Sequence, residues 1–321
     1  MPKLVILPPQ DSLRREWAGR LLEALPDFQI VVAETDGDAA REISAADAAF
    51  GRVPPELLRA ATRLRWLHSP QIAPDAGFYY AELAEHPVVV TNPRGTFNDC
   101  LGEHTLMYVL ALARGLPYYM DAQRRRCWDT EARKSPYVDL AASTALVVGV
   151  GYIGREVARM CTAFGMSVLG VDARWELDVP DVEQHTPEEL DELLPQADFV
   201  LVTVPHTPQT EGMWERRRFG LMKKSAYFIN VGRGRTTRLD DLVEALKSGD
   251  IAGCGLDVFE VEPLPEQHEL WSLPNVLLTP HIGAKDAGSV LERQFQILLD
   301  NARRFARNES LQNVVDKTLW Y

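Results

Sequence analysis

The stretch TALVVGVGYIGREVARMCTAFGMSVLGVD, residues 144–172, contains the clearest structural motif of the chain. It reads as an apolar strand, a turn with glycines at 149, 151 and 154, a helix, and a second strand that ends at Asp172. The motif G-x-G-x-x-G in this context, followed about 18 positions later by an acidic residue, predicts a dinucleotide-binding βαβ unit. The alternative is a glycine-rich turn that binds nothing, with Asp172 as a helix cap.

Each part of this turn has a physical role. Gly149 permits the tight turn, Gly151 lets the backbone approach a pyrophosphate, and Gly154 lets the helix pack closely on the strand. The helix N-terminus offers free N–H groups and partial positive charge to the phosphates. Asp172 can accept hydrogen bonds from the adenine-ribose hydroxyls, and its charge would repel a 2′-phosphate. NAD is therefore favoured over NADP, although Arg174 nearby weakens that preference.

Outside this stretch, short β-branched runs alternate with helical patterns along the whole chain, which predicts parallel sheets covered by helices. One series of strands is expected at 4–7, 29–34, 47–53, 65–69 and 88–92, and a second at 145–150, 167–172, 199–204, 226–231, 253–259 and 275–280. Helices are expected at 11–25, 98–116, 153–164, 238–248 and 285–306. Two series predict an α/β protein with two doubly wound parallel-sheet domains and a cleft between them.

The composition is that of an acidic globular protein. The 321 residues are 46% hydrophobic and carry a net charge of −12, so sizeable cores are expected and nucleic acid and anionic membranes are poor partners. No apolar run is long enough for a signal peptide or a membrane span, which predicts a cytoplasmic protein. The four cysteines are far apart and the histidines lack zinc spacing, so no metal is expected.

Three later stretches each follow a candidate strand: INVGRG (229–234), GLDVFEVEPLP (255–265) and LLTPHIG (277–283). They carry Arg233, Glu262 and His281 beside glycine or proline, at the strand ends where open parallel sheets bind ligands.

These three side chains suit hydride transfer to a carbonyl next to a carboxylate. An arginine fork matches a carboxylate, a histidine can donate a proton to the keto oxygen, and a glutamate behind it fixes its tautomer. A nicotinamide carries the hydride. Taken singly, Arg233 could be a surface ion-pair partner, Glu262 a turn cap and His281 a half-buried structural histidine.

With these motifs in place, the chain resembles the D-isomer-specific 2-hydroxyacid dehydrogenase family from roughly residue 64 to 284. The resemblance lies in GVGYIG and in the segments 222–234, 245–265 and 269–284. It implies that Arg233 binds and orients the substrate, that His281 is the general acid/base, and that Glu262 pairs with it.

The resemblance also implies a cofactor site, a domain division and an assembly. The cofactor contacts would be Gly149, Gly151, Tyr152, Ile153, Gly154, Asp172, Arg174, Pro205, His206, Thr210, Val231, Asp257 and Gly283. A discontinuous substrate-binding domain would comprise residues 1–97 and 285–321, and a dinucleotide-binding domain residues 98–284. A homodimer is expected, with helices such as 98–116 in its interface.

One loop departs from the family pattern. SPQIAPD (69–75) has Gln71 and Ala73 where the family usually has glycines that present N–H groups to the substrate carboxylate, and Pro74 has no N–H. The substrate loop would therefore involve Gln71, Ile72 and Ala73. Either the substrate is an atypical 2-oxo acid, or another turn still presents enough N–H groups.

The function expected is NAD-dependent, reversible reduction of a small 2-oxo acid such as glyoxylate or hydroxypyruvate to the D-2-hydroxy acid. A different class is a dinucleotide-sensing dimer with little turnover, similar to the family's corepressors.

Overall fold

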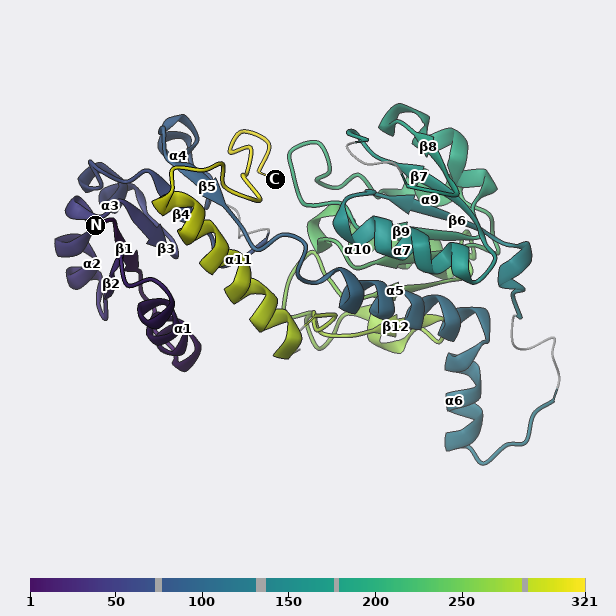
Figure 1. Ribbon diagram of the computed structural model, residues 1–321. Helices are drawn as coiled ribbons and strands as arrows, with labels where there is room; N and C mark the ends of the chain where they lie inside the picture. Colours follow the sequence, from purple (N-terminus) through teal and green to yellow (C-terminus); the bar gives the residue numbers. More distant parts are fainter. Residues whose placement is uncertain (73–76, 131–136, 176–178, 285–287, 321) are drawn as a thin grey trace. The chain divides into compact units, whose positions relative to one another are not determined.

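Two parallel sheets organise the chain (Figure 1). The computed structural model describes residues 1–72, 77–130, 137–175, 179–284 and 288–320. The chain divides into two compact units, of which unit 1 comprises Met1–Thr96 and Asp286–Tyr321, and unit 2 comprises Phe97–Lys285.

Unit 1 contains five parallel strands in the order β2-β1-β3-β4-β5, one of the two common doubly wound orders. The strands are β1 (Lys3–Ile6), β2 (Gln29–Val32), β3 (Ala48–Phe50), β4 (Trp66–His68) and β5 (Val89–Thr91). The helices are α1 (Ser12–Ala24), α2 (Asp36–Glu42), α3 (Pro55–Ala60), α4 (Ala81–Glu85) and α11 (Gly288–Ala306).

Side chains alternate along β1 between two separate cores. Leu4 and Ile6 pack with α1 and α11, whereas Val5 packs with α2, α3 and α4 on the other face. This alternation is the period of two that a strand imposes on its side chains. Helix α11 thus completes unit 1, although most of the chain separates it from β1 (Figure 1).

Unit 2 contains seven parallel strands in the order β12-β11-β10-β9-β6-β7-β8. The strands are β6 (Thr144–Val148), β7 (Ser167–Val171), β8 (Val182–His185), β9 (Phe199–Val202), β10 (Tyr227–Asn230), β11 (Gly253–Leu256) and β12 (Val276–Leu278). The helices are α5 (Asn98–Ala113), α6 (Leu116–Arg124), α7 (Tyr152–Ala163), α8 (Leu190–Leu193), α9 (Arg216–Leu221) and α10 (Leu239–Ser248).

The same alternation divides the core of unit 2. Ala145 and Val147 of β6 face α5 and α7, while Leu146 and Val148 face the side that α8, α9 and α10 cover. The strand order reverses between β6 and β9, and this is the point where such sheets bind dinucleotides, beyond the carboxyl ends of the strands. The predicted α/β fold with two doubly wound parallel sheets is confirmed.

One local expectation was wrong, and one strand was missed. The single helix expected over 98–116 ends at Ala113, because Gly115 adopts a left-handed conformation (φ 60°), and α6 then begins with a proline in its first turn. Strand β8 was missed because its sequence, VEQH, has one apolar residue and lies at the edge of the sheet.

Candidate functional site

The glycine turn between β6 and α7 has the geometry of a phosphate-binding loop. Gly149 has a φ of 95°, and a Cβ there would lie 2.8 Å from Val204 Cγ1. A Cβ on Gly154 would lie 1.9 Å from the carbonyl oxygen of Gly149, so only glycine permits this approach of helix to strand. A Cβ on Gly151 would meet nothing within 4 Å, which leaves open space above its backbone.

Helix α7 begins directly at this open space. Its N-cap is Gly151, which has no side chain to cap the free N–H groups of the first turn. Uncapped N–H groups and the helix dipole make such an N-terminus suitable for phosphate. Tyr152 and Ile153 are the first two residues of the helix, with the Tyr152 side chain exposed. The turn therefore fits a dinucleotide pyrophosphate.

Asp172 follows β7, next to this turn. Its Oδ2 accepts a hydrogen bond of 2.6 Å from the backbone N–H of Val150, and its Oδ1 accepts one of 2.8 Å from the N–H of Arg174. The carboxylate is thus fixed against the glycine turn and remains half-buried. Each oxygen has further acceptor capacity, which a ribose hydroxyl can use.

The segment after β9 lies next to the position where the strand order reverses, between β6 and β9. Thr210 Oγ1 donates to the carbonyl of Pro205 (2.7 Å), which closes a tight turn that contains His206 and Thr207. Val231 is buried directly after β10. These residues follow the carboxyl ends of β9 and β10, on the same edge of the sheet as the glycine turn.

Three adjacent strands carry the predicted catalytic residues. Arg233 follows β10, Glu262 follows β11, and His281 follows β12. The strands are parallel and in register, with Asn230 opposite Leu256 and Leu256 opposite Leu278. All three side chains therefore emerge at one edge of the sheet.

His281 and Glu262 form a hydrogen-bonded pair. The distance from His281 Nδ1 to Glu262 Oε2 is 2.7 Å, and the other oxygen of Glu262 accepts the N–H of Phe259 at 2.9 Å. Because the carboxylate occupies Nδ1, the Nε2 atom is the nitrogen available to a ligand. The His281 side chain is 49% exposed within the described structure, so a ligand can reach it.

The backbone around Arg233 is held by a buried asparagine. Asn230 accepts the N–H of Gly232 (2.9 Å) and donates to the carbonyl of Arg233 (3.2 Å) and to the hydroxyl of Thr237 (3.0 Å). Arg233 donates from Nη1 to the carbonyl of Gly232 at 2.7 Å. The guanidinium is thus presented from a rigid turn.

Asp257 anchors the loop that carries His281. Its carboxylate is 1% exposed and accepts the N–H groups of Ile282 and Gly283, each at 2.9 Å. Burial tends to raise the pKa of Asp257, but hydrogen bonds from His104, Thr279 and the two backbone N–H groups outweigh it and hold the pKa below its ordinary value. Asp257 therefore acts on the loop as an anion.

The expected substrate loop begins after β4 in unit 1. Gln71 exchanges hydrogen bonds with Ser69, and the carbonyl of Ile72 accepts the side-chain N–H of the buried Asn92 at 2.9 Å. Ala73 and Pro74 lie outside the described residues.

Comparison with known proteins gives the family. The family model "D-isomer specific 2-hydroxyacid dehydrogenase, NAD binding domain" matches residues 106–283. The chain belongs to the D-isomer-specific 2-hydroxyacid dehydrogenases. It is 33% identical over 274 residues to glyoxylate reductase from Thermococcus kodakarensis, which covers 83% of this chain and 80% of that protein.

Other relatives agree with this assignment. D-3-phosphoglycerate dehydrogenase from Methanocaldococcus jannaschii is 30% identical over 312 residues, and the match spans 94% of this chain but 57% of that longer protein. A probable 2-hydroxyacid dehydrogenase from Rhizobium etli, solved with NADP, HEPES and L(+)-tartaric acid, superposes with a TM-score of 0.85 at 28% identity, covering 100% of this chain and 99% of that one. Unit 2 thus contains the NAD(P)-binding domain of a family of oxidoreductases.

Several residues that shape the site were missed by reasoning from the sequence. Asn230, Thr279 and His104 hold the loops that carry Arg233 and His281, but none of the three was predicted to be a site residue. Asn230 and Thr279 each lie at a strand end beside a predicted catalytic residue, and this position was an available signal. His104 lies on α5, far from the other two in sequence, so only the fold brings it to Thr279.

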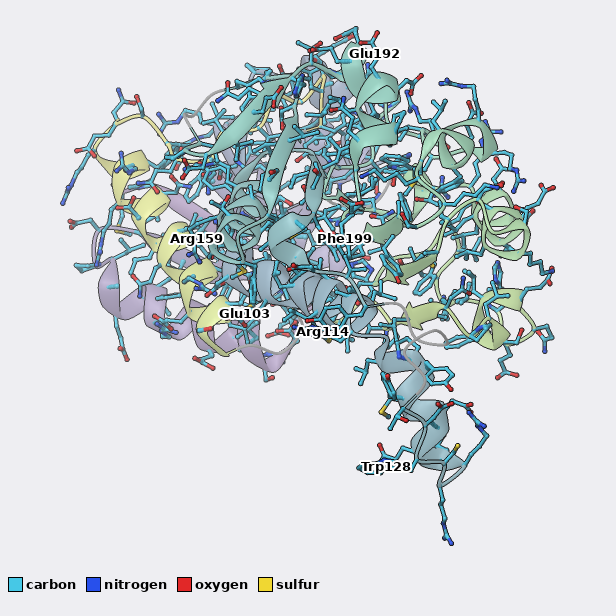
Figure 2. All side chains as sticks on the ribbon, turned by 90° about the vertical axis from the view of Figure 1, so that its right-hand side faces the viewer. Glu103, Arg114, Trp128, Arg159, Glu192 and Phe199 are labelled. Atoms are coloured by element: carbon cyan, nitrogen blue, oxygen red, sulfur yellow. The ribbon has the colours of Figure 1, made fainter. Side chains whose placement is uncertain are left out.

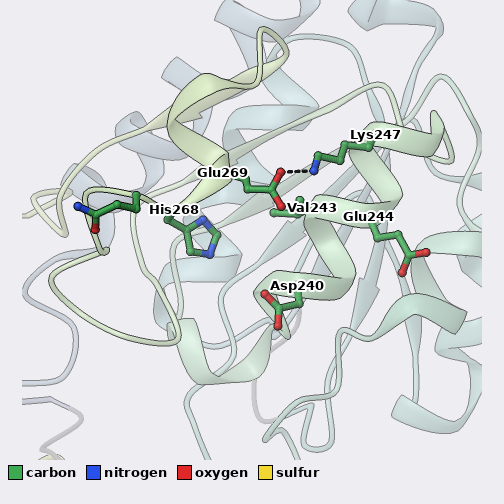
Figure 3. Close-up of a pocket in the computed structure, with 7 residues that line it drawn as sticks. Asp240, Val243, Glu244, Lys247, His268 and Glu269 are labelled. Carbon is green, nitrogen blue, oxygen red and sulfur yellow. Dashed lines mark hydrogen bonds and ion pairs between the residues drawn. The ribbon is translucent and has the colours of Figure 1, made fainter.

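One pocket in unit 2 lies apart from these residues. It measures about 380 Å³ and lies between α10 and the segment before Leu270 (Figure 3). Its lining includes the ion pair of Lys247 with Glu269, and His268, whose Nδ1 accepts the N–H of Leu270. None of the predicted catalytic or cofactor residues lines it. Most of the residues that line it have charged or polar side chains.

Within the described ranges, the structure contains neither a metal-binding cluster nor a membrane-spanning helix. There, no three His, Cys, Asp or Glu side chains group in a way that could hold a metal ion. In the same part of the chain, every helix is too short or too polar to cross a lipid bilayer.

Proposed function

We propose that this chain reduces a small 2-oxo acid reversibly to the D-2-hydroxy acid with NADH. The observation that carries the proposal is the 2.7 Å pair of His281 with Glu262, exposed at the sheet edge from which Arg233 also emerges. A proton donor, its orienting carboxylate and a carboxylate-binding cation are the groups that this reaction needs from the protein.

The proposal gives each of the three residues a role. Arg233 binds the substrate carboxylate in a two-point interaction and polarises the neighbouring keto oxygen. Glu262 holds Nδ1 of His281, so that Nε2 delivers a proton to the keto oxygen and removes it in the reverse direction. The nicotinamide, when bound, supplies the hydride.

The cofactor proposed is NAD rather than NADP. Gly149, Gly151 and Gly154 with the N-terminus of α7 would hold the pyrophosphate, and Asp172 the adenine ribose. A 2′-phosphate would meet the anionic side chain of Asp172. Among the relatives of known structure are proteins solved with NADP or NADPH, so this preference is a property to be measured on this chain.

The substrate proposed is a small 2-oxo acid, with glyoxylate and hydroxypyruvate as the first candidates. Several relatives that cover most of the chain are glyoxylate reductases, and a solved relative from Sinorhizobium meliloti is an NADPH-dependent glyoxylate/hydroxypyruvate reductase. Residues 98–284 would form the dinucleotide-binding domain. Residues 1–97 with 285–321 would form the substrate-binding domain, with Gln71 and Ile72 in its substrate loop.

A homodimer is proposed on the basis of an exposed apolar arm. Helix α6 extends away from the sheet of unit 2, and Trp128 lies near its tip (Figures 1 and 2). Trp128 is 95% and Tyr137 67% exposed, and Leu116, Tyr119 and Met120 are each more than 40% exposed. A second copy would cover this surface. Light scattering after gel filtration should give twice the chain mass for the wild type and the single mass for Trp128→Ser with Tyr119→Ser.

The function is tested by NADH oxidation with a panel of 2-oxo acids: glyoxylate, hydroxypyruvate, pyruvate, 2-oxoisocaproate and phenylpyruvate. His281→Asn serves as the matched variant, because Asn can still donate to Glu262 but has no group to replace Nε2 as an acid. Turnover on at least one acid, lost in the variant with NADH binding kept, supports the proposal. Tight NADH binding without turnover on any acid would support a sensing protein instead.

A further inference from the structure

We propose that His104 and Tyr108 of α5 are positioning residues for His281. They act through Thr279 and Asp257, which hold the loop of residues 279–283. This inference rests on the proposed role of His281 as the proton donor.

The backbone of His281 needs an external restraint. Its φ is 54°, in the left-handed region that is sterically unfavourable for an L-residue other than glycine. Its own N–H turns back to the carbonyl of Thr279 at 3.0 Å, and the next two N–H groups bind Asp257. Such a conformation persists only where the surroundings determine it, so the position of the imidazole depends on how firmly Asp257 is held.

Asp257 is held by Thr279, and Thr279 by α5. Thr279 Oγ1 lies 2.5 Å from Asp257 Oδ1 and 2.9 Å from His104 Nε2. His104 Nε2 also lies 3.4 Å from Asp257 Oδ1. The Tyr108 hydroxyl lies 2.5 Å from Thr279 Oγ1 and 2.9 Å from the carbonyl oxygen of Leu256.

The number of protons available in this cluster determines which groups donate hydrogen bonds and which accept them. The ionised Asp257 only accepts, so the single hydroxyl proton of Thr279 goes to Asp257. Thr279 Oγ1 must then accept from His104, and His104 must carry its proton on Nε2. Tyr108 has an acceptor in either Leu256 or Thr279. His104 is therefore the donor that fixes the rotamer of Thr279.

Helix α5, which carries His104 and Tyr108, packs closely against the sheet. His104 and Tyr108 are one helical turn apart, and their rings meet edge to face with centroids 5.1 Å apart. A Cβ on Gly255 of β11 would lie 2.6 Å from Tyr108 Cγ, so the tyrosine ring rests directly on the strand. α5 thus offers a rigid support for Thr279.

The variants separate the donor from the bulk of the side chain. His104→Phe removes the donor and keeps a ring, while His104→Gln keeps an N–H donor of similar reach. Tyr108→Phe removes one hydroxyl from the cluster. Its matched control is Tyr227→Phe, because Tyr227 is equally buried in unit 2 and its hydroxyl has no partner among the described residues.

Three quantities are measured on each variant: kcat with its solvent isotope effect, the Kd for NADH, and amide exchange in a peptide covering residues 276–284. His104→Phe should lower kcat about tenfold and raise the solvent isotope effect, because proton transfer from a misplaced His281 becomes rate-limiting. The Kd for NADH should stay within about twofold. Exchange at residues 281–283 should accelerate, Tyr108→Phe should follow the same direction, and His104→Gln should restore most of each effect.

Other results would overturn the inference. If His104→Phe exchanges like the wild type in this peptide with an unchanged isotope effect, the cluster does not position the loop. If His104→Gln behaves as His104→Phe, or Tyr227→Phe reproduces the loss, the donor is not the cause. Because exchange needs no turnover, a wild type inactive on every acid would count against the proposed function, while the anchoring of the loop would still be tested.

Discussion

Replacing Asp257 with asparagine tests the energetics of the His281 loop. Asparagine keeps the shape of this buried side chain but exchanges one acceptor oxygen for an NH₂ group. In the wild type, Oδ1 accepts from Thr279 and Ile282, and Oδ2 accepts from Gly283. Whichever way the amide is turned, at least one donor of the loop loses its acceptor and faces another donor.

The magnitude follows from the hydrogen bond lost. A hydrogen bond to a charged group contributes about 1.5–3 kcal/mol. For a domain of the size of unit 2, each kcal/mol shifts the Tm by about 2–4 °C. We therefore expect Asp257→Asn to lower the Tm of unit 2 by about 3–12 °C at pH 7.

The pH dependence has a definite sign. The pKa of Asp257 is lowered on folding, because its hydrogen bonds outweigh its burial. Its contribution is thus fully present above the unfolded pKa of about 3.9 and is lost as the pH falls through the folded pKa. The difference in Tm between wild type and variant should be constant from pH 7 to about pH 5 and should shrink below about pH 4.

Scanning calorimetry across this pH range measures the effect. The control is Asp121→Asn, which removes only an exposed pair with Arg125 at 2.7 Å and should leave the Tm almost unchanged. An unchanged Tm at pH 7 would contradict this expectation. So would a difference that is the same at pH 3 as at pH 7, because it would not arise from the ionised carboxylate.

Three other substitutions test separate parts of the site. Gly154→Ala places a Cβ 1.9 Å from the carbonyl of Gly149, so NADH binding by titration should be lost, and a normal Kd would contradict the loop geometry. Asp172→Asn should raise the ratio of kcat/KM for NADPH over NADH about tenfold, which corresponds to about 1.4 kcal/mol. An unchanged ratio would show that the charge of Asp172 does not set the cofactor preference. Arg233→Ala should damage kcat/KM for the 2-oxo acid more than the Kd for NADH, and equal kinetics on both proteins would exclude its role in substrate binding.

The sequence predicted those features that depend on neighbouring residues. The glycine turn is contiguous: strand, turn, helix and acid all lie within residues 144–172, and each glycine has a local steric reason. Short, apolar and β-branched runs predicted the strands, and their alternation with helices predicted the two parallel sheets. Strand β8 was not predicted because an edge strand needs few apolar residues. Helix α5 ends near Gly115, which adopts a left-handed conformation, and the spacing of apolar residues does not indicate this.

The candidate site was only partly accessible in this way. Arg233, Glu262 and His281 could be selected because each is an ionisable residue at a strand end, but their chemistry needs register between β10, β11 and β12. The sequence could not predict that Glu262 takes Nδ1 rather than Nε2 of His281. It also could not predict that His281 adopts a positive φ.

Apolar patterns and glycine sterics act over a few residues, so they were enough to predict the α/β class, the glycine turn and the ionisable residues at the strand ends. How these residues are held depends on the tertiary structure. Asp257 reaches the N–H groups of Ile282 and Gly283, and His104 reaches Thr279, across large separations in the chain. Such contacts are formed by the pairing of parallel strands and the packing of α5 on the sheet, and no local pattern encodes them.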